Sequence, residues 1–235
     1  MIPLLGPFDP FPPTDRALDE PNGLLAAGGG LSSARLLDAY SRGIFPWFSD
    51  GDPVLWWSPD PRMVLETGDM HLSRSLRRRL RKRDYQVTMD RAFHEVLRHC
   101  ASPREDQAGT WLLPPMIRAY ARLHDSGYAH SVEVWMGDEI AGGLYGVAVG
   151  RMFFGESMFS RRSDGSKIAL AHLVAQLSRW SFPVIDCQMR TSHLASLGAF
   201  DMPRRQFQRL IDRLVKEPAP RGAWTPDEDL SESFL

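Results

Sequence analysis

The sequence predicts an α+β protein with a mixed β-sheet, in which three antiparallel strands are followed by a helix and one further strand. Three observations lead to this prediction. Residues 131–154 resemble three strands separated by the turns Gly137-Asp138 and Gly150-Arg151. Residues 166–178 place apolar side chains at helical spacing, and residues 184–188 form a short apolar run after that helix. At 235 residues with 43% hydrophobic side chains, the chain is long enough to bury a core of this kind.

The first region of the chain, up to about residue 100, is expected to begin with one short helix among coil and aromatic segments, ahead of the basic segment described below. It opens with the proline-rich stretch 10–13 and continues with the glycine-rich stretch 23–30. A helix is predicted next, capped by Ser32 or Ser33 and ended by Gly43. The glycines lack both a following Gly-Lys-Ser/Thr and the Rossmann spacing, so a nucleotide-binding loop is excluded.

Aromatic side chains gather in residues 44–48 and 55–57. Trp56 and Trp57 are expected in the core, where tryptophan is usually found. Trp47 lies beside a proline, and it either packs inside or offers a flat face to a nucleobase. The sequence leaves these two alternatives open.

Residues 71–83 form the most basic segment, with seven Arg or Lys and no acid, although the whole chain has a formal net charge of −1. Leu72, Leu76 and Leu80 recur every four residues, which predicts a helix with one narrow apolar stripe. A solvated helix face is the simpler interpretation. Like charges destabilise such a helix unless a polyanion binds it, so contact with a phosphate backbone is favoured. This contact would supply affinity rather than choice of sequence.

Two carboxylates are embedded in apolar runs, Glu156 within residues 153–160 and Asp186 within residues 184–188. An unpartnered buried carboxylate is costly, so this pattern favours a site that handles an amine or a proton. The order of strands and helix is that of an acyltransferase-like core, as in N-acetyltransferases. In such a sheet the strands before and after the helix part to form a cleft, which would bring the two acids together. Gln188 follows two residues after Asp186, so it is expected on the same face of the strand.

Several other classes are disfavoured. Two cysteines give no disulfide framework, and no segment has the features of a membrane span or signal peptide, so a cytoplasmic protein is expected. The seven histidines lack paired ligand spacing, so no metal site is expected. Coenzyme A binding relies on a glycine-rich loop before the helix. Residues 159–167 contain a single glycine, and Asp164 would compete with a bound phosphate, so no cofactor is expected.

Nine short motifs occur between Pro21 and Phe207: PNGLLA at 21–26, RGIFPWF at 42–48, LWWSPDPR at 55–62, GTW at 109–111, AHSVE at 129–133, GGLYGV at 142–147, FGESMFS at 154–160, IDCQ at 185–188 and SLGA at 196–199. In order and spacing they resemble the bacterial leucyl/phenylalanyl-tRNA–protein transferases. Any one motif can occur by chance, but the ordered set is specific to this family.

The resemblance implies transfer of Leu or Phe, and less readily Met, from aminoacyl-tRNA to proteins that begin with Arg or Lys. The product would carry an N-terminal degradation signal. The resemblance also implies an enzyme without metal or coenzyme A. It implies a small N-terminal α/β domain, residues 1–62 with a limit that can extend to about residue 100, and an acyltransferase-like domain, residues 63–235. A coenzyme A-dependent N-acetyltransferase and a non-catalytic RNA-binding module are the alternatives.

Three polar residues are the candidate catalytic groups. Asp186 is the candidate for taking the proton from the acceptor amine, and Gln188 for orienting the ester or the amine. The resemblance assigns Glu156 to the α-amino group of the aminoacyl substrate, and a structural carboxylate is the alternative. Which acid takes the proton is left open.

The binding residues follow from the motifs. The pocket for the transferred side chain is expected to consist of Leu144, Phe153, Met158 and Ile185. Each of these could also be ordinary core, but together they favour unbranched or γ-branched side chains, and Met158 can adapt to both Leu and Phe. The resemblance implies that Trp47 and Trp111 hold the terminal adenosine of the tRNA. It also implies that the basic helix contacts the tRNA backbone through Arg74, Arg77, Arg78, Arg81 and Lys82.

Overall fold

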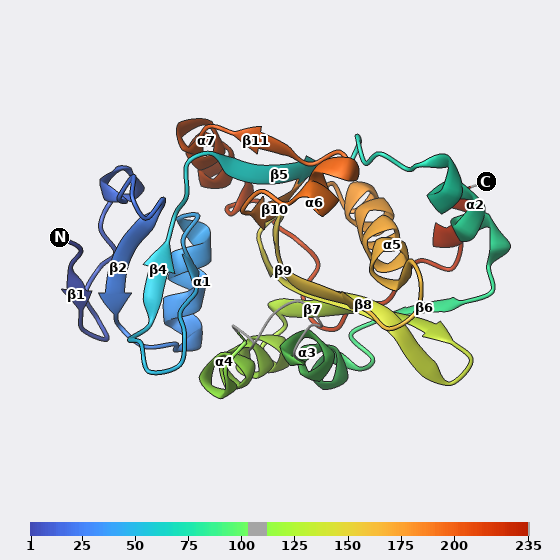
Figure 1. The fold of residues 1–235 in the computed structure, drawn as a ribbon, viewed down its shortest axis with the longest axis horizontal. Coiled ribbons are helices and arrows are strands. Elements are labelled where there is room, and N and C mark those ends of the chain that lie inside the picture. The colour runs from blue at the N-terminus through green and yellow to red at the C-terminus, as the bar shows by residue number, and fades with distance from the viewer. Residues whose placement is uncertain (103–111, 235) are drawn as a thin grey trace.

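The computed structural model describes residues 1–102 and 112–234, which form a mixed α/β chain with two β-sheets (Figure 1). The smaller sheet belongs to the N-terminal region and has the strand order β1-β2-β4-β3. Its strands are β1 (Leu4–Leu5), β2 (Leu24–Gly28), β3 (Phe45–Pro46) and β4 (Leu55–Trp57). A single turn of 3₁₀ helix, η1 (Thr14–Arg16), precedes β2.

Helix α1 (Ser33–Ser41) lies between the two sheets and confirms the helix predicted in this region. The Ser32 side chain accepts a hydrogen bond from the backbone N–H of Arg35, as expected of an N-cap. Gly43 follows the helix with φ of +70°, a conformation that favours glycine. The buried face of α1 contains Leu36 and Tyr40, so this helix joins the N-terminal sheet to the core of the larger sheet.

The larger sheet has seven strands in the order β11-β5-β10-β9-β8-β7-β6. Its strands are β5 (Arg62–Glu66), β6 (Gln86–Met89), β7 (Ala129–Met136), β8 (Glu139–Val149), β9 (Met152–Ser160), β10 (Val184–Gln188) and β11 (Phe200–Met202). All neighbours are antiparallel except β9 and β10, which run parallel. The prediction of three antiparallel strands, a helix and a further strand is confirmed, whereas β5, β6 and β11 were not predicted.

Helices cover both faces of the larger sheet (Figure 1). The helices after the N-terminal region are α2 (Arg74–Lys82), α3 (Phe93–Ala101), α4 (Pro114–Asp125), α5 (Gly165–Arg179), α6 (Ser192–Ser196) and α7 (Arg204–Leu214). One core lies between the sheet and α1, α3 and α4, and includes Phe154. The other core lies under α5 and includes Phe153. Successive residues of β9 therefore face different cores, as strand geometry requires.

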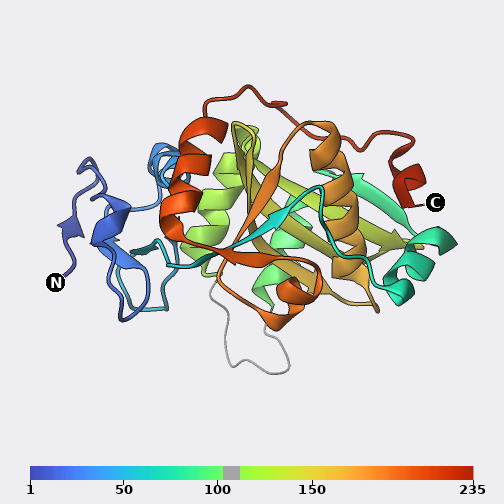
Figure 2. The same cartoon turned by 90° about the horizontal axis from the view of Figure 1, so that it is seen from above.

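The chain after α7 returns across the molecule to α2 (Figure 2). It ends in the 3₁₀ helix η2 (Leu230–Phe234), which packs against α2 and α5. Within residues 1–102 and 112–234, no helix combines the length and apolar character needed to cross a bilayer. The division into residues 1–62 and 63–235 stays a prediction.

Candidate active site

The candidate active site lies where the parallel strands β9 and β10 separate. Only two residue pairs join these strands, and they end at Phe154 and Asp186. Immediately beyond, each strand has a register shift against its other neighbour. Glu156 is the extra residue in β9, and Cys187 is the extra residue in β10. A β-bulge bends a strand and re-aims its side chains, so these two bulges explain how polar groups from both strands meet.

Glu156 lies in a cage of hydroxyl and amide donors. Its Oε1 accepts hydrogen bonds from the Tyr40 hydroxyl at 2.8 Å and from Gln188 Nε2 at 2.8 Å. Its Oε2 accepts one from the Tyr120 hydroxyl at 2.6 Å, and the two tyrosine hydroxyls are 2.8 Å apart. Tyr40 comes from α1 and Tyr120 from α4, and both are fully buried. The cage is therefore assembled from two helices and two strands.

The surroundings of Glu156 tune its protonation. Burial raises the pKa of Glu156 to about 7, helped by the charge of Asp186 and opposed by the three hydrogen bonds. Burial also raises the pKa of Tyr40 and Tyr120 well above 10, so both hydroxyls remain donors. At neutral pH Glu156 is therefore present in both its protonated and its ionised form.

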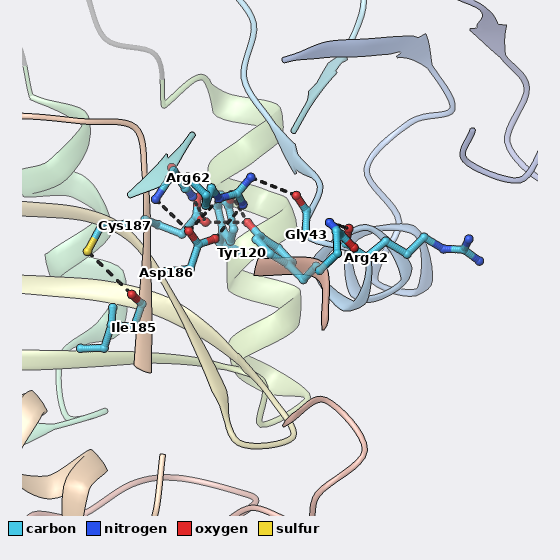
Figure 3. A network of polar contacts seen from close by, with 11 residues as sticks. Arg42, Gly43, Arg62, Tyr120, Ile185, Asp186 and Cys187 are labelled. Atoms are coloured by element: carbon cyan, nitrogen blue, oxygen red, sulfur yellow. Dashed lines mark hydrogen bonds and ion pairs between the residues drawn. The ribbon is translucent and has the colours of Figure 1, made fainter. Parts of the chain in front are cut away.

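Asp186 forms a buried ion pair with Arg62 (Figure 3). Arg62 Nε is 2.8 Å from Asp186 Oδ1 and Nη2 is 2.7 Å from Oδ2, while Nη1 donates to the carbonyl of Gly43 at 3.0 Å. The guanidinium carbon lies 4.9 Å from the ring centre of Phe45 and 4.7 Å from that of Phe207. The side chains of Arg62 and Asp186 are 1% and 0% exposed. Both oxygens of Asp186 thus have a charged donor and no access to solvent.

Gln188 connects the two acids. Its backbone N–H donates to Asp186 Oδ1 at 2.9 Å, while its side chain donates to Glu156. Gln188 has φ of +62°, outside strand geometry. The prediction that Asp186 and Gln188 share a face assumed a regular strand, and the bulge at Cys187 replaces that alternation. The structure nevertheless brings the three candidate catalytic residues together.

The four predicted pocket residues are also neighbours. Leu144 pairs with Met158 across β8 and β9, and Phe153 pairs with Ile185 across β9 and β10. All four belong to or pack against the core under α5; Met158 is partly buried and the others are buried. The ring of Phe153 lies over Gly146, where a Cβ atom would come within 2.5 Å of it. The role of this cluster in holding a substrate stays a prediction.

The tryptophans separate into core and surface. Trp56 and Trp57 are buried, which confirms the expectation for both. Trp47 is 40% exposed; its ring centre lies 5.6 Å from that of Trp57, whose Nε1 donates to its carbonyl at 2.6 Å. The Trp47 ring thus packs near Trp57 and remains partly exposed to solvent. Trp111 lies outside the described residues.

The basic segment forms helix α2 as predicted, with Ser73 as its N-cap and Leu76 and Leu80 buried. Arg79 pairs with Asp84. The five predicted tRNA contacts are exposed, and none has an acid within ion-pair distance in the described part of the chain: Arg74, Arg77, Arg78, Arg81 and Lys82. Within the described residues, the helix therefore presents to solvent five cationic side chains that have no ion-pair partner.

Sequence reasoning missed three site residues: Arg62, Tyr40 and Tyr120. Arg62 is one cation at the start of an apolar strand, the counterpart of the lone acid Asp186, and that signal was available. The tyrosines resemble ordinary core residues of amphipathic helices, so only their hydroxyl partners identify them.

In the described ranges, no group of three or more His, Cys, Asp or Glu side chains is placed to hold a metal ion. Burial and the charge of Asp186 raise the pKa of the Cys187 thiol, which makes it a poor nucleophile.

Comparisons with known proteins agree with the motifs. A family model described as "Leucyl/phenylalanyl-tRNA protein transferase" matches residues 64–212, and the model for the N-terminal domain of that family matches residues 29–60. The chain is 57% identical over 232 residues to the leucyl/phenylalanyl-tRNA–protein transferase of Nitrosospira multiformis, covering 99% of this chain and 100% of the relative. It is 58% identical over 224 residues to that of Nitrosomonas europaea, covering 95% of each.

Among solved structures, L-PGS from Bacillus licheniformis covers 86% of this chain and 68% of its own at 13% identity. Its TM-score of 0.38 is too low to support an argument from fold. The sequence matches define an aminoacyltransferase, which is an enzyme. The chain belongs to the leucyl/phenylalanyl-tRNA–protein transferase family, which confirms the resemblance of its motifs.

Proposed function

We propose that this protein transfers Leu or Phe, and less readily Met, from aminoacyl-tRNA to the N-terminal α-amine of proteins that begin with Arg or Lys. The product would carry an N-terminal degradation signal. Family membership supports transfer from leucyl- or phenylalanyl-tRNA to protein, and the acceptor rule and the use of Met are our extension. The observation that carries the proposal is the hydrogen-bonded chain from Glu156 through Gln188 to Asp186 where β9 and β10 part.

The acyl group is already activated because it is an ester of the tRNA. The reaction therefore mainly requires that the attacking amine be deprotonated and positioned. An N-terminal α-amine has a pKa of about 7.7–8.0, so much of it is protonated at neutral pH. Glu156, with its pKa raised to about 7, is well matched to hold an ammonium group or to accept its proton. We therefore favour Glu156 over Asp186 as the proton acceptor.

Asp186 has a different environment, since both of its oxygens accept hydrogen bonds from Arg62. Taking a proton would require Arg62 to move away. We propose that Asp186 instead fixes the backbone of Gln188 through the bond to its N–H. Gln188 then donates to Glu156, and its amide oxygen is oriented toward the incoming amine or the ester. In this scheme Asp186 and Gln188 position the reacting groups, and Glu156 handles the charge.

The start of α5 supports an acyl carrier other than coenzyme A. The N–H of Ser166 is bonded to the Ser160 hydroxyl at 2.8 Å, and the N–H of Gly165 to the carbonyl of Arg162 at 3.1 Å. Gly165 also packs against the backbone of Gly142, where an added Cβ would be 2.5 Å away. Two of the amides at the helix start that would hold a pyrophosphate are thus already hydrogen-bonded within the protein. We still infer an acyltransferase-like fold, supported by the one parallel pair of the larger sheet, β9 and β10, which separates beside the site.

The substrate contacts complete the proposal. The exposed ring of Trp47, together with Trp111, is assigned to the terminal adenosine. The uncompensated charge of α2 is assigned to the tRNA backbone. The cluster under α5 is assigned to the transferred side chain: Leu144, Phe153, Met158 and Ile185.

The test is transfer of radiolabelled amino acid from charged tRNA to short peptides. Leu-, Phe-, Met- and Ile-tRNA are each offered with peptides that begin with Arg, Lys or Glu. Label is expected in the Arg and Lys peptides from Leu and Phe, weakly from Met and not from Ile, and RNase pretreatment should abolish it. Equal labelling of the Glu peptide would overturn the acceptor rule. Absence of any transfer by folded protein would overturn the proposed reaction.

A further inference from the structure

The C-terminal segment, residues 217–234, is fastened to the body of the protein at successive points. It lies beyond residue 212, where the family-model match ends. Its contacts, in chain order, are Glu217 with Arg151, Gly222 with Gly127, Trp224 with Asp90, Asp227 with Gln176 and Arg179, and Ser231 with Arg83. The segment therefore follows a defined path from the β8–β9 turn to α2, as Figure 2 shows.

Trp224 is one of two side chains of this segment that are buried in the core under α5; the other is Leu230. It is 3% exposed, and its backbone N–H donates to Asp90 Oδ2 at 2.6 Å. Its ring is stacked on His130 with centres 3.7 Å apart and 3° between the planes. Its ring centre also lies 5.8 Å from that of Phe153. Trp180 closes the group with a ring centre 4.9 Å from Trp224.

These contacts limit where the ring of Phe153 can go. Gly146 lies under that ring, with no room for a Cβ atom, and Ile185 is the strand partner of Phe153. Trp224 occupies the space beside it. Interior side chains pack at the density of organic crystals, so a change in the volume of Trp224 is transmitted to Phe153.

The Trp224 ring does not contribute to this core through a hydrogen bond. The indole N–H is buried and has no hydrogen-bond partner among residues 1–102 and 112–234, which is uncommon for a tryptophan inside a protein. A phenylalanine would avoid that penalty but would occupy less space. The size of the indole ring is therefore the property that the surroundings of Phe153 require.

We propose that Trp224 is a positioning residue that fixes the ring of Phe153 and so sets the size of aminoacyl side chain that the pocket accepts. This inference rests on the proposed assignment of Phe153 to the substrate pocket. The C-terminal segment then contributes to substrate choice without touching the reacting atoms. Ordinary core packing is the competing explanation, and it predicts a change in stability without a change in selectivity.

The test compares kcat/KM for Phe-tRNA and Leu-tRNA in the full-length enzyme and in Trp224→Phe. This substitution removes no hydrogen bond and leaves space into which the Phe153 ring can retreat. The ratio of kcat/KM for Phe over Leu is expected to rise about 10-fold, the lower end of what one methylene contributes to discrimination. The KM for the acceptor peptide should not change.

Trp180→Phe is the matched control, because the Trp180 ring contacts that of Trp224, and no ring contact between Trp180 and Phe153 occurs among the described residues. It should lower the melting temperature without changing the ratio. Trp224→Leu provides a second opening of the same space, in case Trp224→Phe folds poorly. An unchanged ratio in both folded Trp224 variants would overturn the inference.

The variant Phe153→Leu tests the assignment of Phe153 to the pocket separately from the role of Trp224. If this variant changes the Phe-over-Leu ratio and the Trp224 variants do not, the pocket assignment stands and the role of Trp224 is rejected. If Phe153→Leu leaves the ratio unchanged as well, the pocket assignment itself is wrong.

Discussion

Replacing Arg62 by methionine tests how the buried charge of Asp186 is supported. The change removes two hydrogen bonds to Asp186, at 2.8 and 2.7 Å, and one to the carbonyl of Gly43 at 3.0 Å. Methionine can still fill the space between the two aromatic rings that flank the guanidinium. A carboxylate with 0% exposure would then lack its countercharge. Breaking a buried pair in this way costs about 3–5 kcal/mol.

The double variant Arg62→Met/Asp186→Asn removes both charges and keeps an acceptor for the N–H of Gln188. It should be more stable than Arg62→Met by at least about 2 kcal/mol, because no unpaired charge remains inside. Urea unfolding of the wild type, both single variants and the double variant gives the coupling free energy. A destabilisation below about 1 kcal/mol in Arg62→Met, or a double variant less stable than Arg62→Met, would refute the reasoning.

The same four proteins distinguish an effect on folding stability from an effect on the rate of amino-acid transfer. If the charge of Asp186 acts on the reaction through Gln188, the double variant should be folded and bind tRNA but transfer amino acid at a strongly reduced rate. Wild-type transfer by the double variant would show that the reaction does not need the charge of Asp186, and would leave it only the role of acceptor for the Gln188 N–H. If the transfer rate falls in proportion to the loss of stability across the four proteins, the ion pair of Arg62 and Asp186 has a structural role only.

Two further predictions concern charge. Because burial raises the pKa of Glu156 from 4.5 to about 7, its contribution to stability is fully present below pH 4.5 and is lost as the pH rises to about 7. Relative to Glu156→Gln, the wild type should therefore lose about 3 kcal/mol across this window in urea unfolding, and a constant difference would contradict the pKa. Removing the exposed charges in Arg78→Gln/Lys82→Gln should raise the KM for tRNA. It should also reduce the salt dependence of tRNA binding by about 0.9 in log–log slope for each phosphate that is no longer neutralised. Arg79→Gln, which removes a cation already paired with Asp84, should change that slope little.

The sequence predicted elements with strong local signals. The helix over residues 33–41 has a capping serine and a terminating glycine, and the strand over residues 184–188 is a short apolar run. Strands β6 and β11 have few residues and exposed positions, so they carry little local signal and form through pairing with distant strands. The order of the mixed sheet therefore follows from contacts that periodicity cannot supply.

The sequence predicted the two acids of the candidate site and Gln188, but it did not predict the other three partners of the acids, Arg62, Tyr40 and Tyr120. Glu156 and Asp186 were recognised because a carboxylate in an apolar run requires an explanation. Arg62 lies 124 residues before Asp186, and Tyr40 lies 116 residues before Glu156, so no spacing rule connects them. The bulges at Glu156 and Cys187 depend on strand register, which local residue preferences do not determine.

The acids of the site receive part of their support from the N-terminal region. Tyr40 donates to Glu156, and the carbonyl of Gly43 accepts from the Arg62 that holds Asp186. Both supports come from the end of α1 and the turn that follows it, whereas the acids belong to the larger sheet. The contact between the N-terminal region and the larger sheet, here called the joint, therefore helps to hold both acids of the site in place. A small shift of the N-terminal region would loosen both carboxylates before any core was exposed, and a chimaera of two relatives would have to preserve the fit at this joint to keep its chemistry.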